Sequence, residues 1–317
     1  GIGSIATAAR LMHLRETGAT PAEIAAARGA AVRAARTWHV FGSIAGVGIL
    51  ARGVRRVRPE DSNAPALPGN LPVLVPLKDG SGGPLPRQKA GTWRAPLVQG
   101  FDDFIWIDDT STDQVTGYAL AVVWLWDALH ADAEAPKDVS ENLAADLAAF
   151  TKNLMKVSPE TGTDLCIRDA DGRLPKHYDL NPRQLAPEAM PVGEDSLIRN
   201  GFNAAMALGV VRAAYHVSND PEIGRYYYAE LVGKRDLPRD MASNAGLIFL
   251  GAPTNFSNVN MLAIALALIG RTETDAYVRR RLDETLTKQF WSTGDSRDVS
   301  HTKQAWFDAV YASYATA

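Results

Sequence analysis

The chain has 317 residues, a formal net charge of −3 and 46% hydrophobic residues, which fits one large domain or two average ones with a substantial core. The weak charge and the lack of a long basic run argue against a nucleic-acid or anionic-membrane partner. The single cysteine, Cys166, excludes an internal disulfide and a thiolate metal site.

The N-terminal part is predicted to be helical. Apolar residues recur at helical spacing over 5–16. Thr20 then provides an N-cap, with Pro21 at the first helical position and Glu23 in the first turn. This signal predicts a second, alanine-rich helix that runs to about Phe41.

Prolines and glycines are dense from 53 to 103. One short strand pairing is predicted at 71–78. A loop of this length inside a compact domain is usually functional or disordered. Because it leads the chain into a cluster of acids, we expect an ordered loop that covers the mouth of a cavity.

Helices follow in pairs. Their predicted ranges are 111–130, 140–157, 196–217, 221–232, 255–270, 274–291 and 301–314. One helix of a pair is apolar nearly all round, as in 118–129 and 261–269, and its successor is amphipathic, as in 277–288. Apolar helices are enclosed and amphipathic ones form an outer layer. We therefore predict an all-α fold, an (α/α) toroid or array of helical hairpins spanning 1–317 as one domain. The apolar runs are too short for the roughly 20 residues of a membrane span.

Five aspartates stand at the entrance to the first apolar helix. They are Asp102, Asp103, Asp108, Asp109 and Asp113, with Trp106 among them. Glycosidases need two carboxyl groups roughly 5 to 10 Å apart, and Asp109 and Asp113 at i and i+4 would share a helix face. Trp106 could stack on a sugar ring. The alternative is structural, because acids in a first turn favour the helix dipole beside an N-cap such as Ser111.

Polar segments also precede the later apolar helices. They include Asn203 before one helix, the asparagines of 255–260 before the next, and His301 before the last. In a toroid the N-terminal ends of inner helices surround a cavity, so we predict one shared site. Capping is the alternative for the asparagines, and His301 could simply begin its helix.

The loop KHYDLNPRQ carries His177, Tyr178 and Arg183. Lyases abstract a proton beside a carboxylate with a tyrosine or histidine base, and arginine neutralises the acid. Functional groups concentrate on such loops. An ordinary polar surface loop is the alternative.

Three segments together resemble bacterial proteins of the six-hairpin glycosidase-like superfamily. They are GSIAGVGILAR at 42–52, WIDDTSTDQVTGY at 106–118 and NFSNVNML at 255–262. Members carry a DTSSD[EQ]xxG-like stretch that opens an inner helix, and 109–117 reads DTSTDQVTG here. The resemblance implies an (α/α) toroid and a glycoside hydrolase, with a polysaccharide lyase or sugar epimerase as alternatives. Fold likeness alone does not fix the chemistry.

The sequence thus predicts a carbohydrate-active enzyme that needs no metal or cofactor. Asp109 and Asp113 are the expected acid/base pair. The expected substrate-binding residues are Trp106, Asp108, His177, Tyr178, Asn203 and His301. The competing hypothesis is a non-catalytic helical toroid that binds a small ligand or acts as a scaffold. From the resemblance and the start at Gly1 rather than Met, we expect a processed protein that is secreted or periplasmic.

Overall fold

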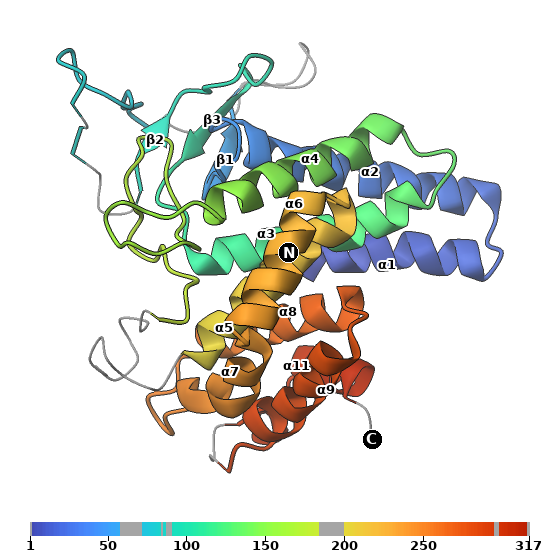
Figure 1. Cartoon of the computed structure of the whole chain (residues 1–317). Helices are drawn as coiled ribbons and strands as arrows, with labels where there is room; N and C mark the ends of the chain where they lie inside the picture. The colour runs from blue at the N-terminus through green and yellow to red at the C-terminus, as the bar shows by residue number, and fades with distance from the viewer. Residues whose placement is uncertain are drawn as a thin grey trace.

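The computed structural model describes residues 2–57, 72–83, 85–86, 91–183, 200–294 and 298–315. Within these ranges the structure is mostly helical, with one small sheet, so the all-α expectation is confirmed at that level (Figure 1). The predicted helix start at 196 lies outside the described residues. None of the described helices is both long enough and apolar enough to cross a bilayer.

The N-terminal hairpin forms as its sequence signals predict. Its helices are α1 (Ile2–Glu16) and α2 (Pro21–Ser43). The Thr20 hydroxyl accepts a hydrogen bond from the Glu23 backbone N–H, and Glu23 Oε2 accepts one from the Thr20 N–H at 3.0 Å. This reciprocal capping satisfies two donors at the start of α2 that have no partner within the helix.

The segment 53–103 contains more regular structure than expected. Its strands β1 (Gly53–Arg56) and β2 (Trp93–Arg94) pair with β3 (Phe104–Ile107) in an antiparallel sheet of order β1-β3-β2. Of the pairing predicted at 71–78, residue 71 lies outside the described residues and 72–78 form no strand. The pairing is present only in part, as a single β-bridge at Lys78 and a hydrogen bond from the Val75 N–H to Trp93 O at 2.9 Å. The sequence did not predict β1, β2 or β3, because each strand is too short to show an alternating pattern.

Nine further α-helices, two π-helices and one 3₁₀ turn complete the described chain. They are α3 (Thr112–His130), α4 (Lys137–Leu154), α5 (Gly201–Ser218), α6 (Pro221–Arg225) with the π-helix η1 (Tyr226–Lys234), α7 (Leu237–Asn244) with the 3₁₀ turn η2 (Ala245–Ile248), α8 (Phe256–Thr272), α9 (Ala276–Thr285) with the π-helix η3 (Leu286–Trp291), α10 (Val299–Thr302) and α11 (Ala305–Tyr314). Only α7 and η2 were not predicted.

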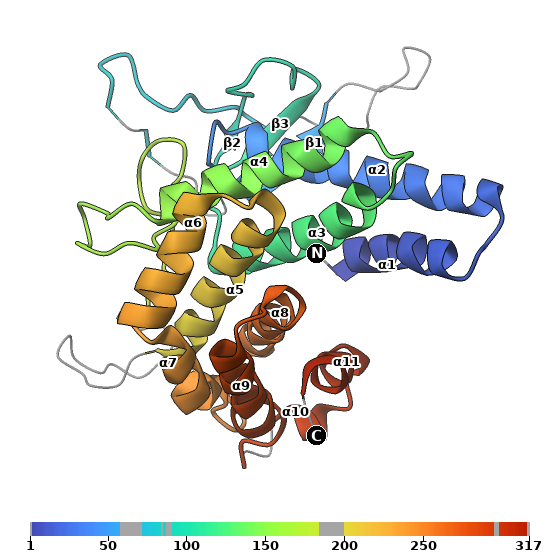
Figure 2. The same ribbon diagram turned by 45° about the vertical axis from the view of Figure 1, so that its right-hand side comes forward.

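The helices lie in two layers. In the inner series α1 contacts α3, α3 contacts α5, α5 contacts α8, and α8 contacts α11. The first four of these are paired with an outer helix, α2 with α1, α4 with α3, α6 with α5, and α9 with α8, and α7 packs against both α5 and α9. Figure 2 shows these hairpins following one another around a curve, from the blue α1–α2 pair to the red α11. The inner helices α3, α5 and α8 are buried on nearly every side, as their apolar sequences predict.

The space between α3, α5 and α8 is filled. Each contacts the other two, and their buried side chains belong to one core cluster. α5 and α8 approach so closely that a Cβ on Gly209 would lie 2.9 Å from Ala265 O. At the N-terminal ends Thr112 Oγ1 lies 3.7 Å from Met261 Sδ. Direct packing therefore takes the place of the expected hollow between these three helices.

Candidate functional site

Asp113 borders a pocket of about 200 Å³ between α2 and α3. The lining residues are Trp38, Phe41, Leu50, Ala51, Arg52, Asp113, Gln114, Gly117 and Tyr118. A Cβ on Gly117 would meet no atom within 4 Å, so the missing side chain helps to leave this space open. The pocket therefore combines aromatic rings with a carboxylate, an amide and a guanidinium.

The Asp113 carboxylate is also part of the start of α3. It accepts a hydrogen bond from the hydroxyl of the N-cap Ser111 and another from Gln114 Nε2 at 2.8 Å. Gln114 Oε1 in turn accepts from the Ser111 N–H at 3.0 Å. Asp113 thus fits both the structural and the functional interpretation of the acidic cluster. It stabilises the first turn of α3, and it also lines the pocket.

Asp109 does not share a helix face with Asp113, since α3 begins at Thr112. Its backbone is left-handed, with φ 67°, a conformation that aspartate tolerates better than most residues. Asp109 Oδ1 accepts the Lys176 N–H at 3.0 Å, and Oδ2 lies 3.2 Å from Arg52 Nη1. Arg52 borders the pocket, so Asp109 contacts a lining residue without lining the pocket itself.

Trp106 and Asp108 lie in the interior, so their expected role changes from substrate contact to structure. Trp106 has no exposed surface, and its Nε1 donates to Ala95 O at 2.8 Å. The Asp108 side chain is fully buried, with Oδ1 accepting from the Thr92 N–H and Oδ2 from Arg94 Nε, both at 2.7 Å. The reason is β3, whose short run of apolar residues enters the core.

His177 and Tyr178 follow Lys176, which bonds to Asp109, and Asn203 of α5 contacts the same segment at Asn181. The Lys176 bond to Asp109 brings His177, which is partly exposed, to this corner of the molecule. Tyr178 packs against the main core, and burial raises the pKa of its phenol. The buried Asn203 donates to Asn181 O at 3.2 Å and so ties α5 to the same segment. None of the three lines the Asp113 pocket.

His301 stands apart from the other predicted site residues. Its side chain is 64% exposed, and its Nδ1 lies 2.7 Å from Asp298 Oδ1 within α10 and its N-cap. α10 packs against η3 and α11 near the C-terminus. The structure therefore does not bring His301 to the Asp113 pocket.

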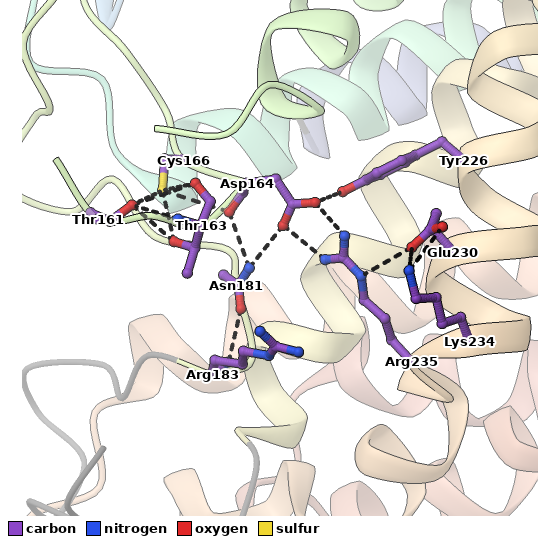
Figure 3. A network of polar contacts seen from close by, with 10 residues as sticks. All are labelled: Thr161, Thr163, Asp164, Cys166, Asn181, Arg183, Tyr226, Glu230, Lys234 and Arg235. Atoms are coloured by element: carbon purple, nitrogen blue, oxygen red, sulfur yellow. Dashed lines mark hydrogen bonds and ion pairs between the residues drawn. The ribbon is translucent and has the colours of Figure 1, made fainter. Parts of the chain in front are cut away.

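A polar network holds the segment after α4 against η1 (Figure 3). Asp164 accepts hydrogen bonds from Tyr226 at 2.7 Å, from Asn181 Nδ2 at 2.9 Å and from both Nη atoms of Arg235. Burial by itself raises the pKa of Asp164, but the bonds from Arg235 and Tyr226 outweigh it and the pKa lies below its ordinary value. This network anchors the segment after α4 to η1.

Asp179, in the same segment, has an unusual environment. Its Oδ1 accepts the Asn181 N–H at 2.7 Å, whereas Oδ2 is buried and has no hydrogen-bond partner among the described residues. Burial raises the pKa of Asp179 to about 7. The folded protein therefore binds a proton on Asp179 between pH 4 and pH 7, where the unfolded chain has released it.

This proton uptake predicts a pH-dependent effect of Asp179→Asn. Because the folded pKa is raised, stability falls as pH rises toward 7, and the substitution removes that loss. The stability of the variant relative to wild type should rise between pH 5 and pH 8, by a few kcal/mol at most. Urea unfolding at both pH values measures the difference. The control is Asp102→Asn at an exposed position, whose stability relative to wild type should be the same at pH 5 and pH 8. An effect of Asp179→Asn that does not depend on pH would refute the raised pKa of Asp179.

Sequence reasoning missed most of the pocket. Trp38 and Phe41 lie three residues apart on α2, a spacing that places both rings on one helix face, with centroids 5.1 Å apart. This aromatic pair was the one sequence feature that could have indicated the pocket, but nothing in the sequence showed that it would face Asp113. Among the described residues there is no group of three or more His, Cys, Asp or Glu side chains that could hold a metal.

Comparisons with protein family models, with curated proteins and with solved structures found no match to this chain.

Proposed function

We propose that this protein is carbohydrate-active and binds one sugar residue in the pocket between α2 and α3, with Asp113 as the acid/base group. The observation that carries the proposal is that Asp113 shares this small pocket with the rings of Trp38 and Phe41. Aromatic rings pack against the apolar face of a sugar, and carboxylate, amide and guanidinium groups bind its hydroxyls.

The size of the pocket favours a single ring. Its volume of about 200 Å³ is below the roughly 300–1,000 Å³ of typical ligand pockets. Trp38 is held in place by a hydrogen bond from its Nε1 to Ser4 Oγ at 2.7 Å and by edge contact with Tyr118. The binding surface is therefore largely formed before a ligand arrives, which lowers the entropic cost of binding.

Hydrolysis is the preferred reaction, with elimination or epimerisation as alternatives. Hydrolysis needs a second carboxyl group, and we propose Asp109, which does not line the pocket but lies 3.2 Å from Nη1 of the lining residue Arg52. The proposal retains the (α/α) toroid as the interpretation of the successive hairpins, and a secreted or periplasmic location. A non-catalytic sugar-binding role is the second candidate, favoured because Asp113 is the one carboxylate among the residues lining this pocket.

Binding is tested with a panel of monosaccharides and methyl glycosides in isothermal titrations. Trp38→Leu should weaken the binding of a panel sugar about 5- to 10-fold through loss of ring packing. The matched control is Ser4→Ala, which removes only the hydrogen bond to Trp38 and should change affinity less than about twofold. Failure of every panel sugar to bind, or equal losses in the two variants, would argue against the pocket as a sugar site.

A further inference from the structure

A second pocket lies on another face of α2, where α2 meets α4. Residues at i, i+4 and i+8 on each helix face the partner, and they are Ala35, His39 and Ser43 on α2 and Asp138, Asn142 and Asp146 on α4. Toward the C-terminal ends of both helices Ser43 and His39 bond to Asp146. Toward their N-terminal ends a pocket of about 260 Å³ separates the helices, lined by Ala35, Arg36, His39, Asp138, Val139 and Asn142.

Asp146 fixes the orientation of His39. Asp146 Oδ2 lies 2.7 Å from His39 Nδ1, and Oδ1 accepts from Ser43 Oγ at 2.7 Å. An ionised carboxylate can only accept hydrogen bonds, so the neutral imidazole carries its proton on Nδ1. Nε2 is then an acceptor, and it has no hydrogen-bond partner in the part of the chain that the structure describes. Phe101 packs at the edge of the ring, with centroids 5.7 Å apart, and further restricts it.

The other polar groups around this pocket also lack a partner among the described residues, and Arg36 and Asp138 are exposed to solvent. Arg36, Asp138 and Asn142 make no side-chain hydrogen bond or ion pair with any residue that the structure describes. Arg36 and Asp138 carry opposite charges on opposite helices but are too far apart for an ion pair with each other. The pocket thus offers one cationic donor on α2 and acceptors in His39 and Asp138, and Ala35 and Val139 add apolar lining.

We propose that this pocket binds a small zwitterion of the α-amino acid type. The ligand carboxylate pairs with the guanidinium of Arg36. Its ammonium group donates to the carboxylate of Asp138 and to Nε2 of His39, while its side chain packs on Ala35 and Val139. A simple anion would lie close to Asp138 and a simple amine close to Arg36, so a ligand with both charges fits best. Asp146 is a positioning residue, since it acts through His39.

The inference is independent of the proposed sugar site. Trp38 and Phe41 face α3, whereas Arg36 and His39 face the first turns of α4. Failure of one site leaves the other untouched, because the two pockets share no lining residue.

The test uses L-leucine and two analogues of the same shape, 4-methylpentanoate without the ammonium group and 3-methylbutylamine without the carboxylate. Isothermal titration of the full chain should show binding of leucine, with each analogue at least about tenfold weaker. Absence of leucine binding, or an analogue that binds as tightly as leucine, would overturn the zwitterion assignment.

Matched variants locate the site. Arg36→Gln and Asp138→Asn should each weaken leucine binding about tenfold. Arg33→Gln and Glu141→Gln remove the same charges from exposed positions of the same helices outside the pocket and should leave affinity within about twofold. Circular dichroism and thermal melts establish that all four variants fold. Equal affinities across variants and controls would place the leucine elsewhere.

Discussion

Replacing Asp113 with asparagine should lower carbohydrate turnover by at least about 100-fold, the typical contribution of a positioned acid or base. The substitution keeps the size of the side chain and one acceptor oxygen for Ser111, but it can no longer transfer a proton. Because Asp113 contributes to the first turn of α3, a stability loss of up to about 1 kcal/mol is expected beside the loss of turnover. The assay is release of reducing sugar from a panel of glycosides and polysaccharides.

Two further variants, Asp102→Asn and Asp109→Asn, show whether the loss of turnover is specific to Asp113. Asp102→Asn removes an exposed carboxylate from the same acidic stretch and should leave turnover unchanged. Asp109→Asn distinguishes the two roles of that residue, because a second catalytic carboxyl predicts a loss similar to that of Asp113→Asn, whereas support of Arg52 alone predicts a milder one. If Asp113→Asn retains wild-type turnover on a hydrolysed substrate, Asp113 is not the acid/base group. A wild type that binds sugar without turnover supports the non-catalytic alternative.

Breaking the buried ion pair between Arg94 and Asp108 should destabilise the fold by about 3–5 kcal/mol, because the remaining charge stays buried without its partner. The two side chains are 2% and 0% exposed. Arg94 also donates to Pro76 O at 2.8 Å and to Val75 O at 3.2 Å, so it fastens the sheet to the preceding segment. Chemical denaturation of Arg94→Met measures the loss.

An exposed ion pair provides the matched control. Lys234, whose side chain is 74% exposed, pairs with Glu230 one helical turn away, and Lys234→Met should cost less than about 1 kcal/mol. The double variant Arg94→Met with Asp108→Leu should recover part of the loss, because it no longer leaves Asp108 as an unpaired buried charge. A cost for Arg94→Met as small as that for Lys234→Met would show that the pair does not hold this corner of the fold.

The helices were predictable because their signals are local. Thr20, Pro21 and Glu23 mark the start of α2, and the all-round apolar character of α3, α5 and α8 indicates enclosure. The inner and outer layers follow from the alternation of apolar and amphipathic helices. The short strands β1 and β2 were not predictable, because two to four residues cannot establish a period.

The site was predictable only in part, because a pocket depends on which helix faces which. Asp113 could be named from its own sequence. The expected pairing with Asp109 depended on a helix that would include both, and the left-handed backbone at Asp109 precedes the start of α3. Trp38 and His39 come from the N-terminal hairpin and Arg52 from the segment after it. Their positions opposite α3 and α4 are set by packing between segments distant in sequence.

The central claim is that a sugar residue occupies the pocket between α2 and α3. A crystal structure of the protein with the tightest-binding monosaccharide of the panel tests this claim most directly. We predict a sugar ring packed against Trp38 and Phe41, with a hydroxyl or the glycosidic oxygen within hydrogen-bond distance of the Asp113 carboxylate. A sugar bound elsewhere on the chain, with this pocket holding only water, would contradict the account.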